Sequence, residues 1–185
     1  MLGLGNSITS GYAPFTLTSV SDLALWLQNG VGVTVSQWDD SSGNDNHVTQ
    51  STDVNQAAVS GGGLDFEEGN SVHYDLASTI TIAENQGFCL AIVMDQETVS
   101  NNTILSKDAD DQIQIVNLNR FRLKANDDTV TTTSFDVAAS FDAGKVLILL
   151  NRSAGASNRF TMFKNGAQLT FDTDTSINEA KQKPW

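Results

Sequence analysis

The clearest alternation of apolar and polar positions lies in residues 145–171, KVLILLNRSAGASNRFTMFKNGAQLTF. Residues 146–150 are an unbroken apolar run, which predicts a strand buried on both faces. The SAGASN stretch after it is rich in turn-forming residues and predicts an exposed loop. Farther on, apolar residues alternate with polar ones on either side of Asn165-Gly166, a pair that tolerates positive φ and favours a two-residue hairpin turn. This segment therefore predicts three antiparallel strands.

The rest of the chain repeats short apolar stretches between turn-forming residues. The run GFCLAIVMD predicts a near-continuous buried strand over residues 87–94 that ends at Asp95. Further strands are predicted at residues 23–28, 64–66, 72–76, 103–105, 112–117, 120–124 and 129–135. One candidate helical turn lies at residues 177–181. Short strands at this spacing predict an all-β fold, an antiparallel β-sandwich or jelly roll, in one domain over residues 20–185.

Residues 1–19 stand apart as an N-terminal arm rich in Gly, Ser and Thr. Its apolar residues predict docking on another protein, whereas a floppy end is the alternative. The arm lacks the basic start and long apolar core of a signal peptide, so secretion by the usual route is not expected. No stretch of 18 apolar residues occurs in the sequence, so insertion into a membrane is not expected either.

The charge balance changes the set of expected partners. The 185-residue chain has 10 Lys+Arg and 22 Asp+Glu, a formal net charge of -12. This charge repels phosphate groups, so we expect neither nucleic acid nor an anionic membrane surface as a partner. Cys89 is the single cysteine, which excludes an intrachain disulfide and a cysteine-based zinc site. Its apolar neighbours predict a small core residue.

Calcium is the metal that the turn regions favour, because hard cations take oxygen ligands from loops. The clusters that qualify are Asp39, Asp40, Asn44 and Asp45; Asp108, Asp110 and Asp111; and Asp172 and Asp174. Turn formation by Asp and Asn is the competing interpretation of each cluster. The preferred pair of calcium ligands is Asp40 with Asn44.

Candidate catalytic groups are few. Asp65 and Glu67 share one face of a predicted strand and are the carboxylate pair that a glycosidase would need. His47 is expected to hydrogen-bond backbone in its turn, and His73 to face away from the core. Neither paired histidines for zinc nor a GxSxG elbow occurs, so we expect no catalytic residue and no cofactor beyond possible calcium. Among the aromatic residues, Trp26 and Trp38 are expected in core strands, and Tyr12 and Trp185 as anchors to a partner.

Several blocks occur in an order that is similar to one family. They are WDDSSGNDNH at residues 38–47, GGGLDFEEGNSVHYDL at 61–76, GFCLAIVMD at 87–95, NTILSKDADDQIQIV at 102–116 and KVLILLNRSAGASNRFTMFKNGAQL at 145–169. Together they resemble laminin-G-like, concanavalin A-like lectin/glucanase domains. The resemblance implies a concanavalin A-like sandwich. The E-x-D-x-x-E pattern of the hydrolytic branch is absent here, and Asp65 and Glu67 fall in a block that is not catalytic in that family.

The arm resembles the start of virion-associated proteins of tailed phages, particularly marine ones. There a short Gly-rich segment leads into a laminin-G-like domain, as MLGLGNSITSG leads into the sandwich here. The resemblance implies a non-enzymatic virion protein, a decoration or fibre component, that binds other virion proteins through residues 1–19, with a host glycan as a further candidate partner. A calcium-assisted carbohydrate-binding lectin and a glucanase-type hydrolase are the alternatives.

The family's closing strand has no counterpart before the end of the chain at TDTSINEAKQKPW. Either that strand is absent, or the arm or a neighbouring chain supplies it. Because an open sheet edge needs cover, we expect a homo-oligomer.

Overall fold

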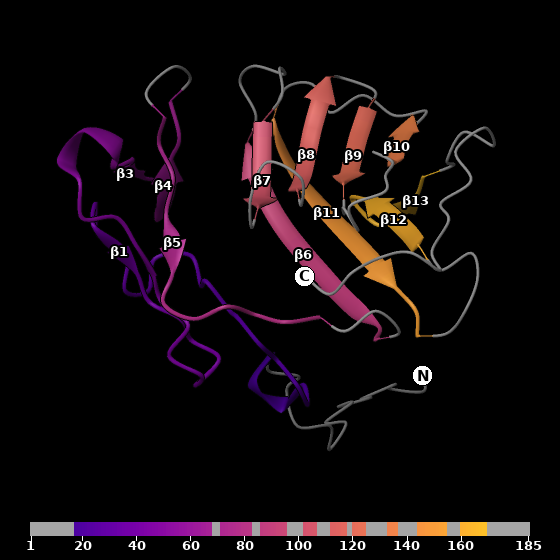
Figure 1. Cartoon of the computed structure of the whole chain (residues 1–185), viewed down its shortest axis with the longest axis horizontal. Coiled ribbons are helices and arrows are strands. Elements are labelled where there is room, and N and C mark those ends of the chain that lie inside the picture. Colours follow the sequence, from indigo (N-terminus) through magenta and orange to yellow (C-terminus); the bar gives the residue numbers. More distant parts are fainter. Residues whose placement is uncertain are drawn as a thin grey trace, which may run out of the picture. The chain divides into compact units, whose positions relative to one another are not determined.

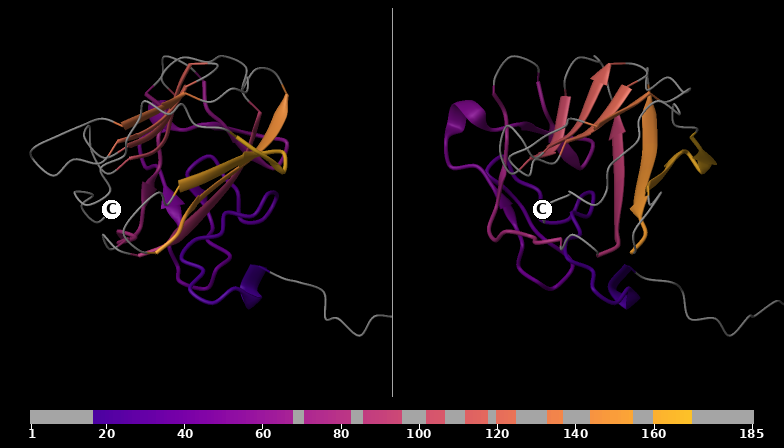
Figure 2. Two further views of the ribbon diagram at one scale, coloured as in Figure 1. Left: turned by 90° about the vertical axis from the view of Figure 1, so that its right-hand side faces the viewer. Right: turned by 45° about the vertical axis from the view of Figure 1, so that its right-hand side comes forward.

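The computed structural model describes residues 17–67, 71–82, 86–95, 102–106, 112–117, 120–124, 133–136, 144–154 and 160–169 (Figures 1 and 2). The chain groups into two compact units, unit 1 over Met1–Ile80 and unit 2 over Thr81–Trp185. This boundary falls inside the range 20–185 that the sequence assigns to one domain. Every strand pair in the described residues is antiparallel, and the described helical elements are 3-10 turns. The predicted all-β, antiparallel class is confirmed.

Unit 1 is built from short strands. They are β1 (Gln37–Trp38), β2 (Val48–Thr49), β3 (Ala58–Ser60), β4 (Gly63–Asp65) and β5 (Asp75–Leu76), with 3-10 turns η1 (Leu17–Ser19) and η2 (Asp53–Asn55). β1, β2 and β5 form one sheet, and β3 pairs with β4. The strand predicted at residues 72–76 is thus reduced to β5.

Side chains do much of the backbone pairing in unit 1. The Nε2 of the buried Gln50 donates to the carbonyl of His73 (2.8 Å), and its Oε1 accepts from the amide of Thr52 (2.9 Å). The Tyr74 hydroxyl donates to the carbonyl of Val35 (2.6 Å) and accepts from the amide of Ala57 (2.9 Å). These bonds satisfy buried backbone groups that strand ladders would otherwise pair.

The prediction of a strand at residues 23–28 is wrong. The segment is extended, but its ladder is limited to a single bridge between Leu27 and Asp40. The carbonyls of Leu23 and Ala24 instead accept hydrogen bonds from side chains of residues 42–46. Trp26 lies in an irregular segment and Trp38 in the predicted strand, β1. Both are half-buried, so neither has the predicted core position.

Unit 2 contains two four-stranded antiparallel sheets, in the orders β10-β9-β8-β7 and β13-β12-β11-β6, whose strands are labelled in Figure 1. Their bounds are β6 (Phe88–Asp95), β7 (Asn102–Ser106), β8 (Gln112–Asn117), β9 (Arg120–Lys124), β10 (Thr133–Asp136), β11 (Lys145–Arg152), β12 (Phe160–Lys164) and β13 (Ala167–Gln168). These strands confirm the ones predicted from residue 87 onwards, and residues 129–132 of the strand predicted at 129–135 lie outside the described residues.

Both sheets contribute to one hydrophobic core. Ile113 and Ile115 come from β8, and buried side chains of β11 and β12 join them. The members from β11 and β12 are Val146, Ile148, Leu150 and Met162. Along β11 the same face ends in Arg152, whose side chain is only 1% exposed. β8 was predictable from its two-residue period, and β11 from its unbroken apolar run.

The apolar runs predict that β11 and β6 are buried on both faces, and this prediction is wrong. Burial alternates along each strand, and Leu147 and Val93 on the outer face are 43% and 71% exposed. Cys89 lies on that outer face and is exposed, so its predicted core position is also wrong. Partial burial by neighbouring atoms still raises the pKa of the thiol, which therefore stays protonated and weakly nucleophilic at neutral pH.

The hairpin at Asn165-Gly166 is confirmed. Both residues have positive φ, 49° and 84°, and they join β12 to β13. The Asn165 side-chain oxygen accepts from the amide of Leu147 at 2.8 Å, and the Asn165 amide donates to the carbonyl of Leu147 at 2.9 Å. The turn thus extends the pairing of β11 with β12 beyond the end of the ladder.

Replacing Asn165 by alanine should destabilise the protein by about 2 kcal/mol, because alanine resists positive φ and the amide of Leu147 loses its acceptor. Asn165→Gly keeps the backbone conformation and should cost about 1 kcal/mol. Urea unfolding of the three proteins measures both values. Equal losses for the two variants would contradict the contribution of backbone conformation.

In the part of the chain that the structure describes, no helix has the length and apolar character to cross a membrane.

Candidate functional site

A loop over residues 39–47 in unit 1 is organised around the carboxylate of Asp40, which is 8% exposed. Its Oδ1 accepts from the amides of Trp26 (2.9 Å) and Ser42 (2.8 Å). Its Oδ2 accepts from the hydroxyl of Ser42 (2.7 Å) and the amide of Asn46 (3.0 Å). These four bonds use the ordinary acceptor capacity of a carboxylate, so Asp40 holds the loop and the segment around Trp26 together.

The environment of Asp40 shifts its titration. Burial raises the pKa of this carboxyl, but hydrogen bonds from the Ser42 hydroxyl and from the amides of Trp26, Ser42 and Asn46 outweigh it. The pKa therefore lies below its ordinary value of 3.8. The charged form is the one that the fold stabilises.

This shift predicts acid sensitivity of unit 1. Because the folded pKa is below the unfolded one, Asp40 contributes stability above the unfolded value of 3.8. The contribution is lost as the pH falls through the folded pKa. Urea unfolding of the natural protein and of Asp40→Asn, followed from neutral pH to about pH 2.5, should show a steeper loss for the natural protein below pH 4 or so. Parallel curves for the two proteins would contradict this assignment.

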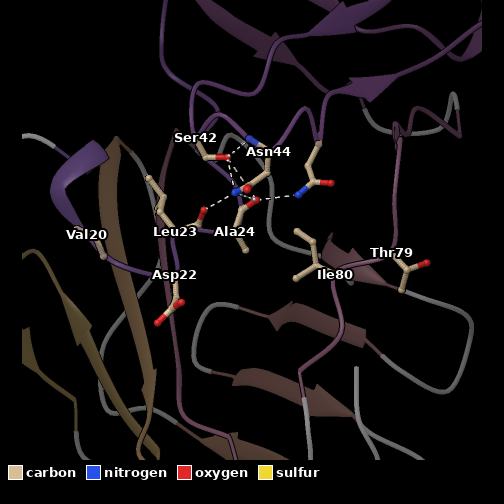
Figure 3. A pocket seen from close by; sticks show the side chains of 9 residues that line it. Val20, Asp22, Leu23, Ala24, Ser42, Asn44, Thr79 and Ile80 are labelled. Atoms are coloured by element: carbon tan, nitrogen blue, oxygen red, sulfur yellow. Dashed lines mark hydrogen bonds between the residues drawn. The ribbon is translucent and has the colours of Figure 1, made fainter.

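Two amide side chains complete the loop. Asn44 Nδ2 donates to the carbonyl of Leu23 at 2.6 Å, and Asn46 Nδ2 donates to the carbonyl of Ala24 at 2.8 Å (Figure 3). The hydroxyl of Ser42 accepts from Asn44 Nδ2 at 3.1 Å. Each amide plane is thereby fixed, and its side-chain nitrogen is committed to the protein backbone.

The structure brings Asp40 and Asn44, the predicted calcium ligands, into one loop. Both oxygens of Asp40 already accept two hydrogen bonds each, which favours the turn interpretation over calcium binding. Among the described residues, no group of three or more His, Cys, Asp or Glu side chains could hold a metal ion. The clusters at Asp108, Asp110 and Asp111 and at Asp172 and Asp174 lie outside the described residues, as do Tyr12 and Trp185.

His47 lies near two exposed carboxylates of its loop, with Nδ1 3.8 Å from an oxygen of Asp39 and Nε2 3.9 Å from an oxygen of Asp45. His47 Nδ1 accepts from the amide of Asp40 at 2.9 Å, which confirms the predicted backbone bond. His73 is exposed, as predicted, and its Nδ1 lies 2.8 Å from the carbonyl of Ser71. The candidate glycosidase carboxylates are both exposed, Asp65 at the end of β4 and Glu67 two residues later.

An open depression of about 570 Å³ lies beside this loop in unit 1 (Figure 3). Its lining residues are Val20, Asp22, Leu23, Ala24, Ser42, Asn44, Asn46, Thr79 and Ile80. Asp22 stands in the wall with φ of 62°, a left-handed conformation that Asp and Asn tolerate better than most residues. The sequence analysis did not predict that Asp22, Asn46, Thr79 and Ile80 line a depression. The one indication was the cluster of Asp and Asn residues in the loop at residues 39–47, which includes Asn46.

The chemistry of the depression follows from which groups are already engaged. The side-chain nitrogens of Asn44 and Asn46 and the hydroxyl of Ser42 donate to protein atoms. The groups left to meet a ligand include acceptors, namely the amide oxygens and the exposed carboxylate of Asp22, and donors, namely the second N–H of Asn46 and the hydroxyl of Thr79. Such a wall suits a ligand rich in hydroxyl or amino donors.

No protein-family model, no curated protein and no solved structure matches this chain.

Proposed function

We propose that the protein is a non-enzymatic surface component of a phage particle, a decoration or fibre protein, that holds host glycans in the depression of unit 1. The observation that carries the binding part is the depression itself, with its rigidly held polar wall. The resemblance of the arm and of the ordered sequence blocks supports the phage part. For the fold of unit 2 we propose a laminin-G-like sandwich, and the core that its two sheets share supports this.

Three properties of the depression favour a neutral or amino sugar. Its volume of about 570 Å³ lies within the usual range for small-ligand sites, and Leu23 and Ile80 offer apolar surface to the C–H faces of a sugar ring. The Asn44 and Asn46 amides are fixed before binding, so little conformational entropy is lost on complex formation. Asp22 and the net charge of -12 disfavour acidic sugars.

A glycan array tests the proposal, with neutral, amino and acidic glycans compared. Asp22→Asn is the sharpest variant, because asparagine keeps the left-handed backbone and a similar shape while it removes the charged acceptor. We expect its affinity for the bound glycans to fall about 10- to 100-fold, the loss of one charge-assisted hydrogen bond. Asp53→Asn, an exposed change in η2 outside the depression, should leave binding unchanged.

The same array separates the alternatives. Binding that a chelator abolishes would favour the calcium-assisted lectin, and hydrolysis of a β-glucan that is lost on changing Asp65 or Glu67 would favour the hydrolase. An array on which nothing binds would remove the attachment role. Deletion of residues 1–19 tests assembly separately, and unchanged incorporation into particles would contradict the docking arm.

A further inference from the structure

The positive charges of the chain are divided unevenly between the two units. All 10 Lys and Arg residues lie between Lys107 and Lys183, so unit 1, over Met1–Ile80, contains none of them. Unit 1 contains nine Asp and Glu residues, whereas unit 2 has 13 beside its 10 Lys and Arg. The carboxylates of unit 1 therefore have no Lys or Arg partner within their own unit.

The carboxylate of Asp22 is the charged group in the wall of the depression in unit 1. Asp22 is exposed, and the lining residues include no Lys, Arg or His. Of the two histidines of unit 1, His47 lies near the carboxylates of Asp39 and Asp45 instead. A cationic ligand can thus meet the Asp22 carboxylate without displacing a cationic side chain of unit 1, and the attraction between the two charges favours binding.

A second carboxylate, that of Asp40, lies directly behind the same wall. Its Oδ2 accepts from the hydroxyl of Ser42 (2.7 Å) and the amide of Asn46 (3.0 Å), and both of these residues line the depression. The donors to Asp40 are neutral, so they hold the carboxylate without cancelling its charge. Because Asp40 is 8% exposed, water and salt screen this charge less than that of a surface group. Asp22 and Asp40 together make the depression attractive to a cation.

We propose that the depression selects sugars that carry a free, protonated amine, the 2-amino-2-deoxyhexoses, over the same sugars with the amine acetylated. An ammonium group has three N–H donors, and the Asp22 carboxylate and the side-chain oxygens of Asn44 and Asn46 are acceptors in the wall. Acetylation keeps the sugar ring but removes the positive charge, so the charge-assisted hydrogen bond to Asp22 is lost. This inference rests on the proposed glycan-binding role and narrows the class of glycan.

Calorimetric titration with two oligosaccharides of equal length, one of glucosamine and one of N-acetylglucosamine, tests the selectivity. We expect the amine form to bind about tenfold more tightly at low salt, which is the effect of one charge-assisted hydrogen bond. The advantage should shrink as the salt concentration rises, because exposed charges are screened.

The outcomes separate this inference from the proposed function. Equal affinities for the two oligosaccharides, or an array on which glycans without an amine bind and the amine forms do not, would overturn the selectivity and leave the glycan-binding role intact. Absence of binding to every glycan would remove both.

Two variants that each remove one negative charge distinguish a site from general attraction to the acidic unit. Asp22→Asn removes the charged acceptor while asparagine tolerates the same φ of 62°, and it should reduce the preference for the amine to about threefold or less. Asp53→Asn changes an exposed residue of η2 outside the depression and should keep the preference at about tenfold. Circular dichroism shows that both variants keep the fold. Equal effects of the two variants on the preference would overturn the assignment to Asp22.

Discussion

Replacing Asp40 by alanine is expected to lower the free energy of unfolding by about 3–5 kcal/mol. The change would leave the amides of Trp26, Ser42 and Asn46 and the hydroxyl of Ser42 without their acceptor. Half-buried donors cannot all recover this loss from water, so the loop and the Trp26 segment should separate. Urea unfolding followed by tryptophan fluorescence measures the loss, because Trp26 and Trp38 both lie in unit 1.

Asp45→Asn provides the control for Asp40. The Asp45 side chain is 89% exposed in the same loop, and its φ of 56° suits asparagine as well as aspartate. We expect a change within about 0.5 kcal/mol. A loss for Asp40→Ala no larger than for Asp45→Asn would show that the hydrogen bonds of Asp40 do not hold unit 1 together.

Replacing Arg152 by alanine is expected to cost a similar amount, about 3–5 kcal/mol. The side chain is 1% exposed and lies on the core face of β11, in line with Val146, Ile148 and Leu150. A charged guanidinium at such a depth needs compensating interactions, and the truncation removes the interaction that Arg152 makes. The truncation also opens a cavity beside the core. Chemical denaturation followed by far-ultraviolet circular dichroism measures the loss.

Two further variants separate the causes at Arg152. Arg152→Met keeps most of the volume without the charge, so it should recover the part of the loss that comes from the cavity. Lys145→Ala removes an exposed charge at the other end of β11 and should change stability by less than about 0.5 kcal/mol. If Arg152→Ala behaved like Lys145→Ala, the buried guanidinium would have no part in the stability of unit 2.

Unit 2 was the more predictable part of the chain. The strands β6, β8, β9 and β11 lie close to their predicted bounds, because apolar runs, two-residue periods and turn dipeptides are local signals. The Asn165-Gly166 hairpin follows from the backbone preferences of two residues alone. Which faces stay exposed was not predictable, since a continuous apolar run looks the same on a strand covered on one face as on a strand covered on both.

Unit 1 depended on contacts that no local pattern encodes. The alternation at residues 23–28 predicted a strand, but the ladder was replaced by side chains of Asn44 and Asn46 some 20 residues away in sequence. Asn44 and Asn46 also line the depression beside this segment. No local pattern marks Arg152 as buried either, and its burial follows from the register of β11 with β6 and β12.

The scarcity of buried apolar side chains in unit 1 affects its response to temperature. Val48 and Ala57 are the fully buried apolar residues among those described there, and Asp40 and Gln50 are buried beside them. The heat-capacity change of unfolding grows with the apolar surface that becomes exposed and shrinks with the polar surface. The heat-capacity change of unfolding of unit 1 should therefore be small. Its free energy of unfolding should then vary little with temperature.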